Sequence, residues 1–394
     1  MKTIIHILNK ILLLFITFFL HSCQQTGCNS SITRIPVDVT SNAELNLSDF
    51  FENFQVLRLE SDAVMGRINR IRYKNDRIYI SDGRTLFIFS DSGEFLFHFS
   101  KVGQGPGEYS NISDFVVSYD TIIILNRALQ RILKYNHMGE FLSEHKLGYF
   151  AQNISPTINQ YRFLYSGNIY DGLNNTHRLR RIRDGEPDSL LFPVDRHRAN
   201  YLHIGIGQID RFFLCQDLNN LYFFETFNDT IYKSVDGKEM KPFFLIDYKG
   251  RNVPASFFEG DFANIVEFFR EFHRRSSYAY GVLHFVANNH FLIFGSYFQQ
   301  NRKLTIFDRK DKISRTFSII RDDIYFNGLV TSIADFAYHA DNGYIFLPLD
   351  ADKIVELRGK YSVSEQFKEI IDAVKWEDNP GLLIFSLKQC KLKN

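Results

Sequence analysis

Short runs of apolar residues alternate with polar loops along most of the chain, and these runs form a repeat. Residues 77–96 and 121–142 share one plan: strand, polar loop, strand, glycine turn and strand. The first strand of this plan recurs four more times, with gaps of 44, 39, 60, 70 and 53 residues between the markers Ile78, Ile122, Tyr161, Leu221, Phe291 and Tyr344. Repeats of this length predict an all-β fold, a six-bladed β-propeller of four-stranded antiparallel blades over residues 54–394. A β-sandwich is the runner-up, but it would not need so regular a recurrence.

A ring of blades needs a strand that closes it, because an open sheet edge leaves backbone groups unpaired. Residues 54–60 lie before the first repeat and belong to none, so we expect them to supply the outer strand of the sixth blade. The apolar run 382–387 competes for that position, and the sequence does not decide between the two. Residues 112–117 and 332–337 are expected to be the inner strands of their blades.

A helical insertion is expected between blades four and five. Apolar residues at steps of 4, 3, 4 and 3 lie on one face of a helix. In this segment they are Phe258, Phe262, Ile265, Phe269 and Phe272. Ser256 and Glu259 have the spacing of a capping box at the start of the helix. A second helix is expected over residues 364–374.

The chain begins with the pattern of a secretory signal. A charged start is followed by the apolar run 11–20, which is too short to span a bilayer comfortably. The run ends in Leu20-His21-Ser22-Cys23, which resembles the lipobox of bacterial lipoproteins; an ordinary signal peptide is the alternative. The resemblance implies a signal peptide over residues 1–22 and a lipid on Cys23. That lipid would anchor the exported protein in the bacterial cell envelope, at the periplasmic or outer-membrane face. Residues 23–53 are polar and are expected to be a tether.

The charge of the chain is nearly balanced, with 46 basic and 45 acidic side chains and a net charge of +1. No global field attracts nucleic acid, so we expect no nucleic-acid partner. Basic clusters at 177–183 and 196–198 are interpreted as solvated segments rather than as a patch for an anionic ligand. The cysteines other than Cys23 lack the spacing of a zinc site or a disulfide scaffold, and no common catalytic motif is present. The sequence therefore identifies no metal and no cofactor.

A glycine-rich segment, GQGPGEY over residues 103–109, joins the first two blades. A strand follows it instead of a helix, which argues against a phosphate-binding loop. A structural turn between blades and a ligand-contacting loop both stay open. The segment resembles the GxGPGEY signature of a family of uncharacterised six-bladed β-propeller lipoproteins from anaerobic Gram-negative bacteria. The resemblance extends to residues 78–82, 114–115 and 379–384 and implies an NHL-like propeller, but it implies no activity.

Loops between the second and third strands of a blade, and loops between blades, lie on the same face of a propeller. The ligand-binding candidates on that face are Asp82, Arg84, Gln104, Glu108, Tyr109, Arg127 and Arg131, together with Asp229, Arg302, Asp350 and Asp352. Asp82 has an alternative role, which is to cap its own turn. We therefore expect an envelope binding or scaffolding protein that recognises a peptide, glycan or protein partner on this loop face.

The alternative function is a propeller enzyme, a lyase or a hydrolase, with a metal ion in the central channel. Its site would combine single residues from several blades, and the sequence does not show which. His197 and His203, or His284 and His290, are pairs that can meet near the ring axis. An isolated histidine in a β-rich chain is more often packed or exposed than a metal ligand, so the binding function is preferred.

Overall fold

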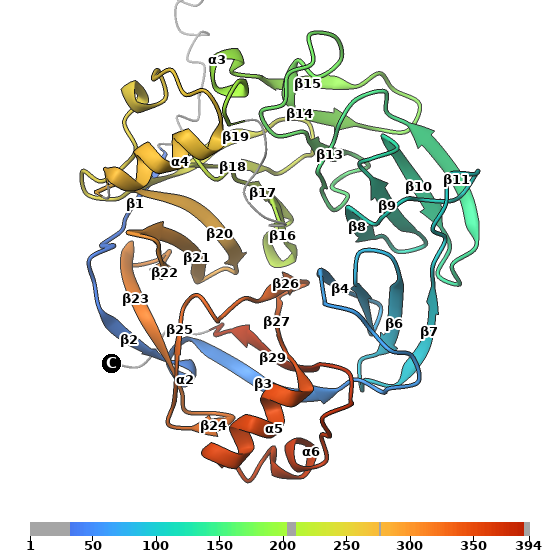
Figure 1. Cartoon of the computed structure of the whole chain (residues 1–394), viewed down its shortest axis with the longest axis vertical. Coiled ribbons are helices and arrows are strands. Elements are labelled where there is room, and N and C mark those ends of the chain that lie inside the picture. Colours follow the sequence, from blue (N-terminus) through green and yellow to red (C-terminus); the bar gives the residue numbers. More distant parts are fainter. Residues whose placement is uncertain (1–31, 203–209, 276, 390–394) are drawn as a thin grey trace, which may run out of the picture. The chain divides into compact units, whose positions relative to one another are not determined.

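Six blades, each with four antiparallel strands, stand around one axis in the computed structural model, which describes residues 32–202, 210–275 and 277–389 (Figure 1). This arrangement confirms the predicted six-bladed β-propeller. Blades one to three consist of β4 (Arg70–Lys74), β5 (Arg77–Ser81), β6 (Leu86–Ser90) and β7 (Phe95–Phe99); β8 (Asp114–Val117), β9 (Ile122–Asn126), β10 (Arg131–Tyr135) and β11 (Phe141–Lys146); and β12 (Asn153–Ile154), β13 (Arg162–Tyr165), β14 (His177–Ile182) and β15 (Ser189–Pro193).

The last three blades follow the same order. They consist of β16 (Phe212–Cys215), β17 (Asn220–Phe223), β18 (Thr230–Ser234) and β19 (Lys241–Asp247); β20 (Ala279–Ala287), β21 (Phe291–Phe298), β22 (Asn301–Asp308) and β23 (Ile313–Asp322); and β26 (His339–Asp341), β27 (Tyr344–Leu349), β29 (Gly381–Leu387) and β3 (Phe51–Arg58). The first strands of neighbouring blades, such as β4 and β8, contact one another around the axis. The predicted inner strand at 112–117 corresponds to β8, whereas the inner strand of blade six is β26 and not residues 332–337.

The repeat found in the sequence corresponds to hairpins closed by glycine. In blade one, residues 91–94 join β6 to β7, and Gly93 adopts a positive φ of 88°. A Cβ atom at this position would lie 2.3 Å from the backbone oxygen of Arg58, so the turn has no room for a side chain. Gly139 takes the same place in blade two, with φ 76°.

Both of the terminal strands that competed for ring closure belong to blade six. β3 pairs antiparallel with β29, from Gly381 opposite Arg58 to Leu387 opposite Phe51. β3 is therefore the outer strand of the blade, and β29 is its third strand. The first and last parts of the propeller close the ring together.

The structure differs from the expected tether over residues 33–53. β1 (Thr33–Pro36) pairs parallel with β19, and β2 (Ala43–Asn46) pairs parallel with β23, before α2 (Leu47–Phe50) leads into β3. This segment therefore runs along blades four, five and six in turn (Figure 1). Spaced apolar residues such as Ile35 and Leu45 are fully buried, although the surrounding composition is polar. Cys23 and the signal sequence lie outside the described residues.

Helix α4 (Ile265–Arg274) lies between β19 and β20, and it begins later than the apolar spacing predicted. The Asn264 side chain caps it by accepting hydrogen bonds from the backbone N–H groups of Val266 and Glu267, both at 3.0 Å. The expected capping box does not form, because residues 255–257 are a short 3-10 turn. The later start rotates the buried face, which contains Phe268 and Phe272.

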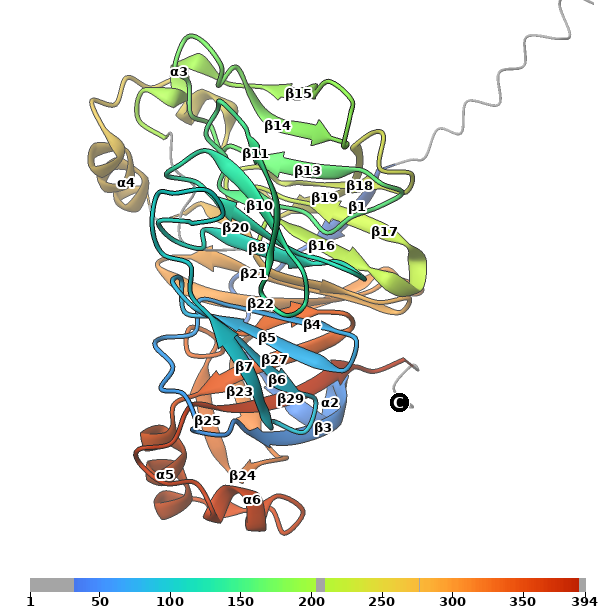
Figure 2. The same cartoon turned by 90° about the vertical axis from the view of Figure 1, so that its right-hand side faces the viewer.

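The remaining elements lie between the strands of the blades along the chain. They are α3 (Arg196–Ala199), β24 (Phe326–Asn327), β25 (Leu329–Ser332), α5 (Ala351–Lys360), β28 (Ser362–Val363) and α6 (Lys368–Asp372). The helix expected over 364–374 is present in shorter form as α6, and α5 is a further helix before it; both lie between β27 and β29. α4 and α5 lie towards the same face of the ring, away from the turn that joins β16 to β17 (Figure 2). Among the described residues, no helix is long and apolar enough to cross a membrane.

Candidate functional site

The glycine-rich segment 103–109 forms a loop whose polar groups bond to one another. The Glu108 carboxylate accepts a hydrogen bond from the backbone N–H of Gly105 at 2.8 Å. Tyr109 is fully buried, and its hydroxyl donates to the backbone oxygen of Arg84 at 3.0 Å. A Cβ atom on Gly103 would lie 2.0 Å from the Glu108 carboxylate, so only glycine allows this close approach. These contacts make the segment a structural turn between blades one and two.

The other predicted residues of this face also have partners within the protein. Arg131 forms an ion pair with Glu144 at 2.9 Å and donates to the backbone oxygen of Gln104 at 3.2 Å. The Asp82 carboxylate accepts from the backbone N–H groups of Arg84 and Thr85, at 2.9 and 2.8 Å, and so caps its own turn. The Arg127 guanidinium lies 5.4 Å from the centre of the Phe150 ring. Ligand binding by these residues stays a prediction.

The four further positions named on this face are spread over three blades. The Asp229 carboxylate accepts from the Asn252 amide at 2.8 Å, and Arg302 donates to the Tyr297 hydroxyl at 3.1 Å. Asp350 precedes α5 and Asp352 lies in its first turn. The structure does not bring these residues together with the loop 103–109 into one cavity.

A network of ion pairs crosses the central channel. Arg70 and Arg72 extend from β4 towards Asp114 on β8 and Asp210, which precedes β16. Arg70 Nε lies 3.0 Å from the Asp114 carboxylate, and Arg72 lies 2.8 Å from that of Asp210. Arg70 also pairs with Asp210, and Arg72 with Asp114 at 3.4 Å. Two guanidinium groups therefore neutralise two carboxylates and join blades one, two and four.

Asp114 extends this network to blade three. Its second carboxylate oxygen accepts from the backbone N–H of Ile154 at 3.0 Å. Burial raises the pKa of Asp114, although both arginines act against this effect. Burial also acts on Asp210, but there Arg70 and Arg72 outweigh it and hold the pKa well below its usual range. The balance of charge in the channel therefore depends on both arginines.

Two histidines line the same channel, and they are not the pairs expected from the sequence. His284 on β20 and His339 on β26 both lie beside Asp210. Burial lowers the pKa of both, to about 3 for His339. His197 lies in α3 and contacts the backbone oxygen of Gly260, and His203 lies outside the described residues.

The second expected pair, His284 and His290, does not form. His290 lies in the turn between β20 and β21, where its backbone N–H donates to the Asn288 side chain at 2.9 Å. Its partner in the prediction, His284, belongs to the channel instead. Within residues 32–202, 210–275 and 277–389, no group of three or more His, Cys, Asp or Glu side chains is placed to hold a metal ion.

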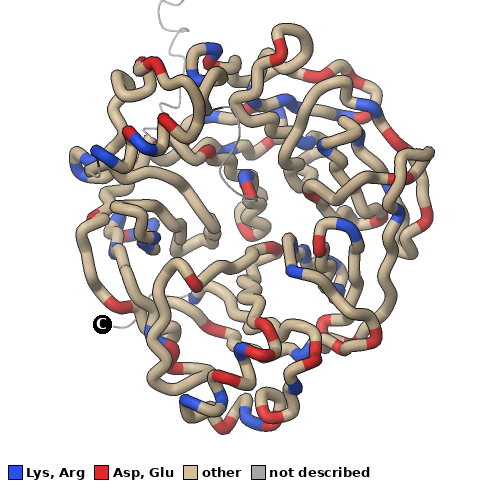
Figure 3. The backbone as a smooth tube through the Cα atoms, in the orientation of Figure 1, with Lys and Arg blue, Asp and Glu red and all other residues tan. Residues whose placement is uncertain are grey.

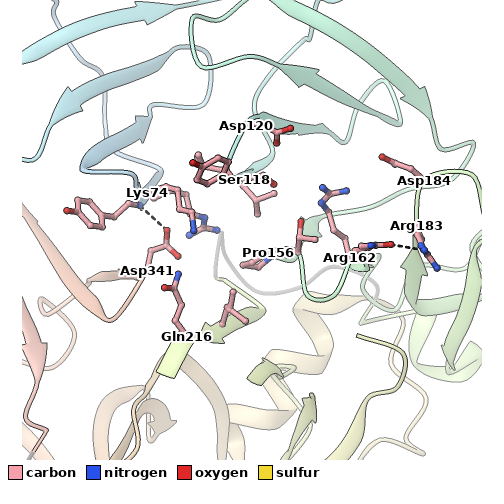
Figure 4. A pocket seen from close by; sticks show the side chains of 17 residues that line it. Lys74, Ser118, Asp120, Pro156, Arg162, Arg183, Asp184, Gln216 and Asp341 are labelled. Carbon is pink, nitrogen blue, oxygen red and sulfur yellow. Dashed lines mark hydrogen bonds between the residues drawn. The ribbon is translucent and has the colours of Figure 1, made fainter. Parts of the chain in front are cut away.

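A cavity of about 640 Å³ opens at one end of this channel, and side chains from five of the six blades line it (Figure 4). Blades one, two, three, four and six contribute, among others, Lys74, Ser118, Arg162, Gln216 and Asp341 in that order. The cavity lies where the first strand of a blade turns into the second. The predicted residues Asp82 and Arg131 lie at the other end of the strands, because Val117 pairs with Ile122 while Arg131 pairs with Asn126. α4 does not cover this cavity.

The charged side chains of the cavity differ in their partners. Asp341 accepts from the backbone N–H of Tyr73 at 2.9 Å; burial raises the pKa of this carboxyl, and Arg72 opposes the shift. The Arg183 guanidinium donates hydrogen bonds to the side chains of Gln160 and Glu186, both at 2.7 Å. The backbone tube shows both signs of charge on every blade, with neither gathered on one side (Figure 3).

The sequence analysis missed the residues of this cavity. Each blade contributes only a few of them, so no local motif exists to be found. The signal that could have located them is their place in the repeat. Lys74, Ser118 and Asp341 each stand where the first strand of a blade ends or has just ended.

The comparison with solved structures finds proteins that resemble this chain to different degrees. A candidate exported protein from Bacteroides fragilis is 18% identical with a TM-score of 0.72, covering 91% of this chain and 100% of that chain. At this identity the likeness shows the fold alone. A member of the DUF4221 family from Bacteroides vulgatus is 8% identical (TM-score 0.48, 86% and 98% covered), and virginiamycin B lyase from Staphylococcus aureus is 12% identical (TM-score 0.44, 85% and 99% covered). The search of curated proteins finds no match.

A family model also matches most of the chain. The model of a domain of unknown function, DUF4934, matches residues 32–386. This range begins just before β1 and ends within β29, so it includes all six blades and the N-terminal strands that pair with them. The chain therefore belongs to the DUF4934 family, and in this member the family domain is a six-bladed β-propeller.

Proposed function

We propose that this protein is an exported lipoprotein of the bacterial cell envelope that binds a peptide or glycan ligand at the mouth of its central channel. The observation that carries the proposal is the cavity of about 640 Å³, to which five blades contribute side chains. Its size is that of pockets which hold small organic ligands, and sites of this kind commonly combine residues from several elements. A binding site made this way depends on the closed ring rather than on one loop.

The channel beneath the cavity supports binding rather than passage. Arg70 and Arg72 pair with Asp114 and Asp210 across the axis, so charged side chains occupy the space that a ligand would have to cross. A ligand entering the mouth therefore meets a charged, hydrogen-bonded floor. Buried ion pairs of this kind are held in fixed geometry by their mutual bonds, which favours a rigid site.

A propeller enzyme with a metal ion in the channel is the second candidate. His284 and His339 favour it, because burial lowers the pKa of both, and neutral imidazoles are suited to metal binding. The channel carboxylates argue against it, because Asp114 and Asp210 are already bound by arginine. Stoichiometric metal retained after purification, and lost in a His339→Gln variant, would favour this second candidate.

Export and anchoring are supported by the lipobox-like end of the signal, residues 20–23, and by the candidate exported protein among the structural neighbours. We infer that the lipid on Cys23 holds the propeller at an envelope membrane. Cys23→Ala is expected to move the protein from the membrane fraction to the soluble fraction of the cell. If the variant stays in the membrane fraction to the same extent as the wild type, the lipoprotein assignment is wrong. We also propose that the GxGPGEY segment is a signature of the lipoprotein family and that the propeller is NHL-like.

The binding proposal is tested by a peptide and glycan array probed with the full chain. Ser118→Trp places a bulky side chain in the cavity, while Ser100→Trp places one beside Arg84 on the opposite face. We expect Ser118→Trp to abolish capture of the ligand and Ser100→Trp to preserve it. The reverse result would locate the ligand on the loop face predicted from the sequence. If the wild-type protein captures no peptide or glycan on the array, a binding function for the two ends of the propeller is refuted.

A further inference from the structure

Arg162 is a cation in the cavity that no described carboxylate pairs with. It begins β13, and its side chain projects into the cavity opposite Lys74 and Asp341 (Figure 4). Its buried Nε has no hydrogen-bond partner, and it forms no ion pair with a described residue. Burial lowers the pKa of Arg162, with Asp184 and Asp120 acting against the shift. A guanidinium that is partly dehydrated and unpaired is unfavourable unless an anion reaches it.

Two further polar groups of the cavity lack partners in the described part of the chain. Thr157, in the hairpin between β12 and β13, has a buried hydroxyl oxygen without a hydrogen-bond partner. Lys74, which ends β4, forms no ion pair with any described carboxylate. Arg183 is different, because Glu186 already neutralises it. Arg162 and Lys74 therefore offer cationic groups from two blades that no described carboxylate pairs with.

The rest of the lining is suited to a ligand rich in hydroxyl groups. Gln160 and Gln216 offer amides, and Asp341 offers a carboxylate. Tyr119 is 83% exposed and offers an aromatic face. Sugar hydroxyls donate to carboxylates and accept from amides, and the C–H faces of sugar rings pack on aromatic rings. At about 640 Å³, the cavity is also far larger than an inorganic anion.

We propose that the cavity binds an acidic oligosaccharide, with a sugar carboxylate paired to Arg162 and with Lys74 as a second cation across the cavity. This inference rests on the proposed function and names the ligand class for the same site. A carboxylate can accept two parallel hydrogen bonds from the planar guanidinium, and the terminal NH2 groups of Arg162 are the donors that a ligand can reach, because its Nε is buried. The neighbouring hydroxyl groups of the sugar then reach the amides of the lining.

The test is a calorimetric titration of the full chain with a short oligogalacturonate and with its neutral methyl ester. We expect the acid to bind at least about tenfold more tightly than the ester, which corresponds to about 1.4 kcal/mol. Arg162→Gln is expected to remove this preference while leaving the affinity for the ester nearly unchanged. Lys74→Gln gives a second, independent measurement, since it changes a side chain at the end of a strand and leaves Arg162 in place.

Arg321→Gln is the matched control, because Arg321 pairs with Glu44 at the surface of blade five and does not line the cavity. Equal affinity for acid and ester overturns the acidic ligand but leaves a cavity ligand in place. An unchanged preference for the acid in both cavity variants overturns the roles given to Arg162 and Lys74. Tighter binding of a short polyglutamate than of the oligogalacturonate overturns the sugar. Binding of these probes that survives Ser118→Trp places them outside the cavity and overturns the proposed site itself.

Discussion

Asp114→Asn tests whether the ion pairs of the channel hold the blades together. The change keeps the size of the side chain but leaves two guanidinium groups facing the single carboxylate of Asp210. In the wild type, the Asp114 carboxylate lies 3.0 Å from the Arg70 Nε and 3.0 Å from the backbone N–H of Ile154, and both of these groups are donors. The NH2 group of the new amide would face one of them, so two donors would oppose each other. Breaking a buried ion pair by removing one partner lowers the free energy of unfolding by about 3 to 5 kcal/mol. We expect a loss in this range.

The assay is urea unfolding of the full chain, with Glu44→Gln as the control. Glu44 and Arg321 also form an ion pair, but their side chains are 45% and 42% exposed. Such surface pairs contribute less than about 1 kcal/mol, so the control is expected to unfold near the wild-type midpoint. If Asp114→Asn and Glu44→Gln lower the free energy of unfolding equally, the channel network does not stabilise the ring and the reasoning is wrong.

Three further predictions follow from burial. His339 has a pKa of about 3 in the folded chain, against about 6.5 when unfolded. The unfolded chain therefore takes up a proton first, and the stability of the fold decreases as the pH drops from 6.5 towards 3. Melting curves of His339→Gln should show a smaller decrease over this range than those of the wild type. Phe268→Ala should lower the free energy of unfolding by about 3 to 5 kcal/mol, and Phe269→Ala by clearly less, because only Phe268 is fully buried; equal urea midpoints would contradict this. Deletion of residues 24–41 removes β1 and should lower the melting temperature, whereas an unchanged value would mean that β1 adds nothing to blade four.

The sequence was sufficient to predict the ring because the repeat is local. Each blade contains hairpins whose apolar strands and turn glycines, such as Gly93 and Gly139, are close in the chain. The N-terminal strands were mistaken for a tether because a parallel strand on the outside of a blade needs few apolar residues. α4 was placed too early, because Phe258 and Phe262 continue the apolar spacing although they precede the helix.

The site was less predictable than the fold, because it depends on contacts between blades. The GxGPGEY loop attracted attention as a motif, and Glu108 and Tyr109 turned out to satisfy the loop itself. The residues of the cavity carry no motif, since Lys74, Arg162 and Asp341 come from three blades. Whether an arginine is paired depends on neighbours that are distant in the chain, and only the structure separates Arg162 from the paired Arg183.

The course of residues 33–58 along three blades sets the order in which the propeller can form. This segment is synthesised before every blade, yet Thr33 pairs with Phe244 and Arg58 pairs with Gly381. Blades one to three can form from neighbouring hairpins, whereas closure has to wait for strands made hundreds of residues later. Pairing across such sequence separations is slow, because a long loop must close before any contact compensates for it. Until then the edges of blades four, five and six stay open to other chains, so ring closure is the step at which folding competes with aggregation.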